Sequence, residues 1–462
     1  MWAWFGAGCS STPTDPLATL KNNGASTESR LQSMDMLDAA PADPAYRAAM
    51  RQLLFAPGVV QPVRAECFDR LYADDRSKLL ELVVLNLPAL EALEWRRGLC
   101  EKIAGLDWKE ATPALVRALG RPMKGWIRDV RERPEYLAIA QMYPDGTVGE
   151  VVFDVLVHSD PATQANLRAR CWELMFELGE EQRLVQLLDG LPADTSDLLL
   201  LDLRRGWVDL GVLPRTREEV LWLRSLQEPD RKEFWAAARE AMQSVSPEVR
   251  RSMQMKDLGV VVAARQMAPE MLSLSRDQLI ARLEAVRVAH GGRVYSPDFR
   301  GYGSGHSESL HDRRKELTWG DAAAIVIMMQ ALQDEAFVDH LFEIARRDHS
   351  DRSTEHGGIV RLDASGQPEL VEFPASSRGS DTQFHASQKM FDASYTAIGH
   401  FHLHATEFDN ERHAGPHMGD FGYADSTGVN GFVFTSLSNR RLNADWYRRG
   451  QVVVDLGVIE LP

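Results

Sequence analysis

The stretch Gly399-His400-Phe401-His402-Leu403-His404 decides how the C-terminal part of this chain is expected to fold. It ends an apolar run that begins at residue 395. Because successive side chains of a strand point to opposite faces, the three histidines are expected on one face of a β-strand. Two imidazoles on one face, joined by a carboxylate from a neighbouring segment, are the ligands of an open zinc site. Asp420 follows sixteen residues after His404 and is the candidate carboxylate.

Histidines are concentrated around this stretch. Of the 13 histidines, six lie between His385 and His417, and only His158 lies before residue 290. Histidine is the commonest metal ligand and a proton-transfer group near neutral pH. A single histidine such as His385 or His413 is more often an ordinary core or surface residue, whereas three in alternation favour a set of ligands.

The composition indicates a soluble globular protein of several domains. A chain of 462 residues is longer than one ordinary core requires, which predicts two or three domains. Hydrophobic residues make up 44% and charged residues 26%, as is usual for soluble proteins. The net charge of −15 argues against nucleic acid as a partner, because phosphate binding needs clustered Lys and Arg. No apolar run approaches the roughly 20 residues of a transmembrane helix.

Residues 1–40 are predicted to form an N-terminal tether. Ala7-Gly8-Cys9 is similar to the end of a bacterial lipoprotein signal, in which the cysteine carries the lipid. A lipid anchor at Cys9 would place the protein at the cell envelope. The segment lacks a basic start and is short for a signal, which a start codon assigned too far downstream would explain. An ordinary frayed terminus and a cytoplasmic location therefore stay open.

Residues 41–286 are predicted to form α-helical repeats. The pattern Arg-x-x-Cys recurs with its cysteine at Cys67, Cys100 and Cys171, offset by 33 and then by 71 residues. Helix pairs with a period in the thirties are typical of an α-solenoid. The cysteines are then small buried apolar residues rather than a disulfide framework. The region resembles HEAT-type repeats, which implies a long surface for a protein partner.

The chain changes character after this region. Residues 287–315 are rich in Gly and Ser and are predicted to form a linker. Residues 316–462 are predicted to form a separate α/β unit, with helices over 319–332 and 335–346. Alternating patterns predict strands over 358–362, 369–373, 395–402, 431–435 and 451–459.

The order of motifs in this unit resembles the JAMM (JAB/MPN+) zinc metallopeptidase domain, over about 150 residues from Trp319 onward. The matching features are Glu355-x-x-Gly358, Gly399-x-x-His402-x-His404, and Asp420 followed by Ala424. The resemblance implies a mixed sheet flanked by helices. It also implies zinc bound by His402, His404 and Asp420, with Glu355 beside the bound water.

The expected activity is zinc-dependent hydrolysis of a peptide or isopeptide bond in a protein or peptide substrate. Zinc lowers the pKa of its bound water toward neutrality. The non-ligand carboxylate of Glu355 can activate that water and pass the proton to the leaving amine. The helical repeats would then present substrates or exclude them.

Three features depart from the family pattern. Ala405 replaces the proline after the second histidine, and the long spacing to Asp420 requires the loop over 406–413 to bulge. His417 stands where the family has a serine that donates a hydrogen bond to the developing oxyanion. We expect the His417 imidazole to serve as this donor. The alternative is that His417 becomes a further metal ligand, which would close the site and leave the zinc structural.

Two other histidines and two other functions remain to be considered. His400 would replace His404 as a ligand if the register slipped by two residues, but we expect it to pack beside the site. His356 is expected to point away from Glu355. The main functional alternative is a non-catalytic interaction scaffold with a structural metal or a degenerate MPN-like domain. A cupin-like histidine site would need a longer series of short strands.

Overall fold

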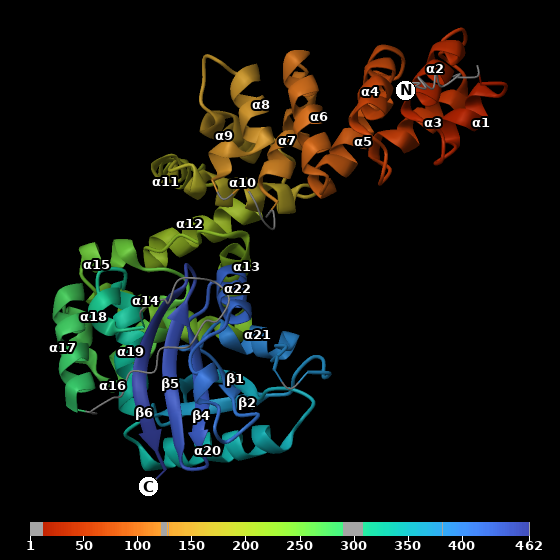
Figure 1. Cartoon of the computed structure of the whole chain (residues 1–462). Coiled ribbons are helices and arrows are strands. Elements are labelled where there is room, and N and C mark those ends of the chain that lie inside the picture. The colour runs from red at the N-terminus through yellow and green to blue at the C-terminus, as the bar shows by residue number, and fades with distance from the viewer. Residues whose placement is uncertain (1–12, 122–126, 128, 290–307, 381, 462) are drawn as a thin grey trace. The chain divides into compact units, whose positions relative to one another are not determined.

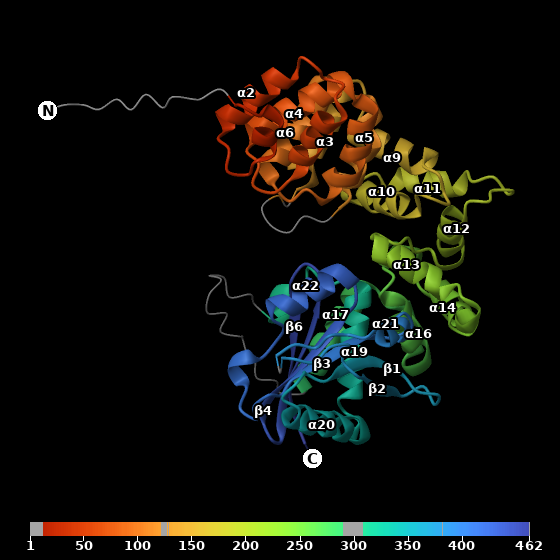
Figure 2. The same ribbon diagram turned by 90° about the vertical axis from the view of Figure 1, so that its right-hand side faces the viewer.

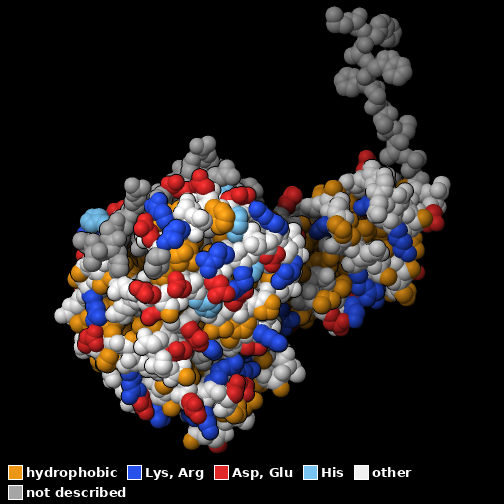
Figure 3. Space-filling view, turned by 90° about the horizontal axis from the view of Figure 1, so that it is seen from below, with side chains coloured by type: hydrophobic (Ala, Val, Ile, Leu, Met, Phe, Trp, Pro, Cys, Tyr) orange, Lys and Arg blue, Asp and Glu red, His pale blue; other side chains and the backbone are white. Residues whose placement is uncertain are grey.

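The computed structural model describes residues 13–121, 127, 129–289, 308–380 and 382–461. The chain divides into two compact units, Met1–Val185 and Gln186–Pro462 (Figure 1). Cys9 and most of the expected linker over 287–315 lie outside the described residues. No helix in the described ranges is long and apolar enough to cross a membrane. Acidic, basic and apolar side chains are interspersed on the face drawn in Figure 3.

The first unit is helical throughout its described part (Figure 2). Proline occupies the first turn of several helices, where its missing N–H has no partner to lose. The helices are α1 (Pro16–Lys21), α2 (Thr27–Leu37), α3 (Pro44–Phe55), α4 (Gln61–Asp74), α5 (Arg76–Asn86), α6 (Leu93–Gly105), α7 (Thr112–Leu119), α8 (Pro134–Met142), α9 (Val148–His158) and α10 (Ala165–Glu177), and α11 (Glu181–Asp189) crosses into the second unit.

The three cysteines of the repeated pattern are buried, as predicted. Cys67 lies in α4, Cys100 in α6 and Cys171 in α10, each at most 1% exposed and without a disulfide. Burial raises the pKa of Cys67 and Cys171 to about 12, so both are neutral thiols. They therefore act as compact core residues.

A series of inward-pointing arginines recurs with nearly constant spacing. Each donates to a backbone carbonyl between 6 and 14 residues earlier, at or near the end of the preceding helix. Helix C-terminal carbonyls lack partners within their own helix, and the guanidinium supplies the missing donors. The series is Arg30, Arg64, Arg96, Arg133, Arg168 and Arg204, at intervals of 34, 32, 37, 35 and 36 residues.

This series changes one detail of the predicted repeat. Arg97 occupies the arginine position of the second Arg-x-x-Cys pattern but is exposed. The neighbouring Arg96 is the buried residue, and it pairs with the fully buried Glu135. The arginine of the sequence pattern at Cys100 is therefore one residue away from the buried arginine.

The second unit combines helices with a six-stranded sheet. Its helices up to residue 289 belong to the same compact unit as the sheet. The helices are α12 (Leu198–Leu210), α13 (Arg217–Leu226), α14 (Lys232–Ser244), α15 (Pro247–Ser252), α16 (Asp257–Met267), α17 (Arg276–Ala289), α18 (Leu310–Arg313), α19 (Trp319–Ala331), α20 (Glu335–Ser350), α21 (Gln388–Ser394) and α22 (Met418–Thr427).

The sheet has the order β2-β1-β3-β4-β5-β6 and is mixed. Only the β3–β4 pair is parallel, and the other four pairs are antiparallel. The sequence patterns did not predict β5. The predicted strand over 395–402 begins only at Gly399, because α21 ends at Ser394 and a turn follows. The strands are β1 (Gly357–Leu362), β2 (Pro368–Phe373), β3 (Gly399–His404), β4 (Gly431–Ser438), β5 (Arg441–Arg448) and β6 (Val452–Glu460).

Helix α16 packs closely against α19 and against the sheet through buried contacts. A Cβ atom built at Gly259 of α16 would lie 2.0 Å from the carbonyl oxygen of Ala397, so the two backbones touch. The buried Lys256 ammonium, just before α16, donates to Asp321 of α19 and to Asn430 beside β4. This helical layer is therefore part of the core that supports the histidine strand.

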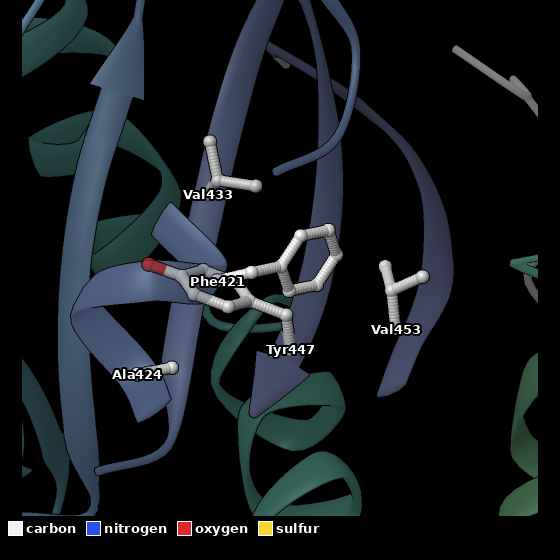
Figure 4. Packing of buried hydrophobic residues seen from close by; sticks show 5 residues of the cluster. All are labelled: Phe421, Ala424, Val433, Tyr447 and Val453. Carbon is white, nitrogen blue, oxygen red and sulfur yellow. The ribbon is translucent and has the colours of Figure 1, made fainter. Parts of the chain in front are cut away.

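Helix α22 packs on the face of the sheet that carries the histidines. Figure 4 shows its packing against β4, β5 and β6, and the Tyr447 ring of β5 lies edge-on to that of His402, with centroids 6.2 Å apart. Packing of α22 on this face therefore places Asp420 opposite β3. The buried cluster consists of Phe421, Ala424, Val433, Tyr447 and Val453.

Candidate metal centre

Strand β3 presents three buried histidines on one face, as its alternation predicts. His400, His402 and His404 are only 4–7% exposed. Gly357 of β1 is paired with His402, and a Cβ atom at Gly357 would lie 2.6 Å from the Phe401 carbonyl oxygen. Glycine therefore allows β1 to approach the histidine strand closely enough to place the residues before it at the site.

Four side chains converge at the end of β3. The Nε2 atom of His402 lies 3.2 Å from both His404 Nε2 and Asp420 Oδ1. His404 Nε2 lies 3.8 Å from Asp420 Oδ2 and 3.9 Å from Glu355 Oε1. Ligand atoms around a tetrahedral zinc, with bonds near 2.0–2.1 Å, are separated by roughly 3.3 Å. These groups could therefore hold a metal ion.

Glu355 lies beside the histidine pair rather than at a solvated helix end. It is 6% exposed and precedes β1, and its backbone N–H donates to the carbonyl of Gln383. The distance from Glu355 Oε1 to His404 Nε2 is longer than the distance from Asp420 Oδ1 to His402 Nε2. The structure thus brings together all four residues that the resemblance assigned to metal and water.

The charges in this cluster are strongly coupled. Burial disfavours a cation at His402, but Asp420 outweighs burial and raises the pKa of His402 to about 9. Burial would raise the pKa of Asp420, yet the neighbouring His402 holds it below its usual range. Burial and repulsion from His402 lower the pKa of His404 to about 3. A bound metal ion would replace the proton of His402, so binding should release protons.

Backbone contacts orient the ligand atoms. His404 Nδ1 lies 3.1 Å from the carbonyl oxygen of His413, so Nδ1–H donates and the Nε2 lone pair is left for a metal. Asp420 Oδ2 accepts the backbone N–H of His417 at 2.7 Å, at the start of α22. A carboxylate at this place also interacts favourably with the helix dipole. These backbone contacts therefore orient both candidate ligands.

Asp348, near the end of α20, fixes the backbones on both sides of the cluster. It is 1% exposed and accepts the N–H of His356 through Oδ1 and the N–H of Ala405 through Oδ2. These residues directly follow Glu355 and His404. One buried carboxylate thus ties together the two segments that carry the candidate base and a candidate ligand.

His417 lies against the cluster. Its ring stacks on His404 with centroids 4.7 Å apart, and a ring nitrogen lies within 4.8 Å of ligand atoms of His404 and Asp420. Burial lowers the pKa of His417, which favours the neutral imidazole. A neutral ring at this distance suits either an N–H donor or a fourth ligand, so the geometry accommodates both expected roles.

His356 and His400 have other partners. His356 Nδ1 contacts Glu372 at 3.1 Å, and Nε2 contacts Asp351 at 3.3 Å, so it faces away from the metal group as expected. His400 Nδ1 lies 2.7 Å from the Tyr423 hydroxyl. Burial lowers the pKa of His400 to about 3, so its ring is neutral.

Sequence reasoning missed three residues of this site. Asp348 belongs to an amphipathic helix and carries no local sign of its role, whereas Tyr423 and Tyr447 are aromatic residues of ordinary spacing. Tyr423 follows Asp420 by three residues within α22. Because residues three apart are neighbours on a helix surface, this spacing could have placed Tyr423 near the candidate ligand.

No family model, curated protein or solved structure matches this chain. The resemblance to JAMM metallopeptidases therefore depends on the residues of the site and their order. Among the described residues, two overlapping groups of three could hold a metal ion: Glu355 with His402 and His404, and His404 with His417 and Asp420.

Proposed function

We propose that the second unit is a zinc-dependent hydrolase that cuts a peptide or isopeptide bond and is built like a JAMM-type domain. One observation carries the proposal. Two imidazoles and a carboxylate converge at ligand spacing, with the buried carboxylate of Glu355 beside them. A purely structural site would not need this additional acidic group.

The donor set fits zinc. Two neutral imidazole nitrogens and one carboxylate oxygen, from His402, His404 and Asp420, are the ligand types of open catalytic zinc sites. The hydrogen bond from His404 Nδ1–H to a carbonyl matches the support that zinc-bound histidines have. When bound, zinc would supply Lewis acidity to water and to the substrate carbonyl.

Proton transfer, stabilisation of the oxyanion and positioning of the site are assigned to residues of this chain. Glu355 takes the proton of the attacking water, holds it, and passes it to the leaving amine. His417 donates an N–H toward the oxyanion that develops on the substrate. Asp348 holds the backbone segments that follow Glu355 and His404 in fixed positions.

The helical first unit is proposed to be a HEAT-like repeat region that binds substrate or a protein partner. The regular interval of the inward-pointing arginines supports a repeat. In each repeat an arginine side chain then donates hydrogen bonds to backbone carbonyls at the end of a helix. A lipid anchor at Cys9, with a place at the cell envelope, remains a prediction; the alternative is a cytoplasmic protein.

Metal content and cleavage test the proposal together. Purified protein should hold about one zinc per chain, and H402A and D420A should lose it. E355Q should keep the zinc but lose cleavage of denatured casein and of an isopeptide-linked lysine peptide. E343Q, at an exposed position of α20, is the matched control and should behave as wild type. Full activity in E355Q would refute the mechanism.

The second candidate is an interaction scaffold with a structural metal. The position of His417 favours it, because a ring nitrogen there is close enough to complete the ligand set. In that case zinc would be held by four protein groups, and no zinc-loaded variant or wild type would cleave either substrate.

A further inference from the structure

A pocket of about 400 Å³ opens at the metal group. This volume is within the usual range of small-molecule sites, about 300–1,000 Å³. Its lining includes all four residues assigned to metal and water, which are Glu355, His402, His404 and Asp420. The other lining residues therefore contact the part of a substrate that lies next to the bond to be cut.

Glycine stands beside the histidine strand β3 on both sides. Gly357 of β1 pairs with His402, and Gly431 of β4 pairs with His400. Because directly paired residues of neighbouring strands share a face, both glycines lie on the face of the histidines. Neither has a side chain, so another group can lie against the backbone at each position.

Aromatic rings occupy both of these positions. The Cδ1 atom of Phe384 lies 3.1 Å from the place that a Cβ atom of Gly357 would take. The Cζ atom of Tyr447, from β5, lies 2.2 Å from the place that a Cβ atom of Gly431 would take. Both aromatic residues line the pocket. The histidine strand is therefore flanked by one aromatic ring on each side.

The charges around the pocket favour an uncharged group. The described lining contains no Lys or Arg, whereas Glu355 and Asp420 belong to it. An acidic side chain would meet these two like charges and no basic side chain. An ammonium group would lose its water of hydration against the apolar side chains of Phe384 and Met390, which also line the pocket.

We propose that this pocket is the substrate subsite next to the scissile bond and takes an uncharged aromatic side chain, such as that of phenylalanine. Phe384 is half-buried and lies in the loop before α21, so its ring can pack on that of the substrate. It is the specificity-determining residue of this subsite. The inference rests on the proposed hydrolase function, because it places the subsite beside the metal that would hold the scissile bond.

Hydroxamates that anchor on zinc measure the preference without needing cleavage. Calorimetry of zinc-loaded wild-type protein would compare acetohydroxamate, 3-phenylpropanohydroxamate and the 4-carboxyphenyl and 4-(aminomethyl)phenyl analogues of the latter. The phenyl compound should bind at least about tenfold tighter than acetohydroxamate, since burial of about 60 Å² of apolar surface gives this factor. Each charged analogue should bind at least about tenfold weaker than the phenyl compound. Equal affinities of the phenyl compound and acetohydroxamate, or tighter binding of either charged analogue, would overturn the subsite.

Two alanine variants test the assigned residue. F384A should reduce the advantage of the phenyl compound over acetohydroxamate about fivefold, as loss of one ring contact allows. The affinity for acetohydroxamate should stay within about twofold, because the metal group is unchanged. F373A is the matched control and should keep the wild-type advantage, since Phe373 packs on the same apolar cluster but is not part of the described pocket lining. An equal loss in both variants would refute the role of Phe384, and the wild-type series decides the subsite even if F384A fails to fold.

A separate probe distinguishes this failure from failure of the metal site. N-acetylphenylalaninamide and N-acetylalaninamide carry no zinc-binding group, and saturation-transfer NMR can compare their affinities for the wild-type protein. Preference for the phenylalanine amide without hydroxamate binding would support the subsite and refute the metal proposal. Lack of preference in both probe pairs would refute the subsite alone if the hydroxamates bind, and both proposals if they do not.

Discussion

Substitution of His417 separates a catalytic site from a structural one. If His417 donates to the oxyanion, H417A should keep zinc and lower kcat about 100-fold, the usual effect of removing one such donor. H417S should recover part of the activity, because a hydroxyl can donate from a similar place. Zinc content and steady-state kinetics check this. A loss of zinc in H417A equal to that in H402A would instead make His417 a ligand.

The buried carboxyl group of Glu308 predicts how stability depends on pH. Burial, with the nearby Asp455, raises the pKa of Glu308 to about 8. Both of its carboxyl oxygens are buried without a partner among the described residues. Between its ordinary pKa and about 8 the unfolded chain loses this proton while the folded chain keeps it, so stability falls as pH rises. Each unit of pKa difference is worth about 1.4 kcal/mol.

The substitution E308Q should remove this dependence. The urea concentration at the unfolding midpoint of wild type should decrease as the pH is raised from about 5.5 to about 7.5, and that of E308Q should decrease clearly less. E101Q, at an exposed position of α6, serves as the control and should follow wild type. Parallel curves for wild type and E308Q would show that Glu308 ionises normally in the folded protein.

At the scale of elements, neighbouring arginines on α6 test the repeated helix contact. Arg96 is 2% exposed and donates to Leu90, Ala118 and the buried Glu135, whereas Arg97 is exposed. R96A should lower the free energy of unfolding by about 3–5 kcal/mol, because it leaves a buried carboxylate without its main partner. R97A should change it by less than about 0.5 kcal/mol. Chemical denaturation measures both, and equal effects would contradict the assigned role.

Elements also explain why the site has its geometry. The β1–β3 pairing and the packing of α22 place Glu355 and Asp420 on the two sides of the histidine strand. Asp348 then holds the backbone beside the ends of β1 and β3. Each element contributes one or two groups, so none of them would bind a metal in this way alone.

At the scale of the whole molecule, the helices that precede the sheet in the second unit share buried contacts with it. The Lys256 ammonium donates to Asp321 and to Asn430. The indole N–H of Trp222 donates to the backbone carbonyl of Tyr395, shortly before β3. The second unit should therefore be the smallest part of the chain that carries the site.

Two fragments test this expectation. A fragment of residues 186–462 should fold and bind one zinc. A fragment of residues 316–462 should not, because it would expose the apolar α19 and leave the charge of Asp321 without Lys256. Circular dichroism, thermal unfolding and zinc content check both, with the full chain as the reference for zinc affinity. Cooperative unfolding and normal zinc binding by the shorter fragment would show that the helical layer is dispensable.

Features that depend on neighbouring residues could be predicted from the chain alone. Alternation placed three histidines on one face of β3, helical periodicity predicted a helical N-terminal region, and the cysteine pattern predicted buried positions. Such patterns are encoded within a few residues, because side chains repeat every two residues in a strand and every 3.6 in a helix. The change from helical to alternating patterns likewise predicted an α/β unit.

Which distant groups meet was settled by the folded core. The buried carboxylate of Asp348 accepts the backbone N–H of Ala405, 57 residues later, and the Tyr423 hydroxyl lies 2.7 Å from Nδ1 of His400. The sheet also contains a strand, β5, that no local pattern had predicted. These contacts depend on loop closure and on the packing of layers, and the free energy that selects them comes from burial of the whole core rather than from any short segment.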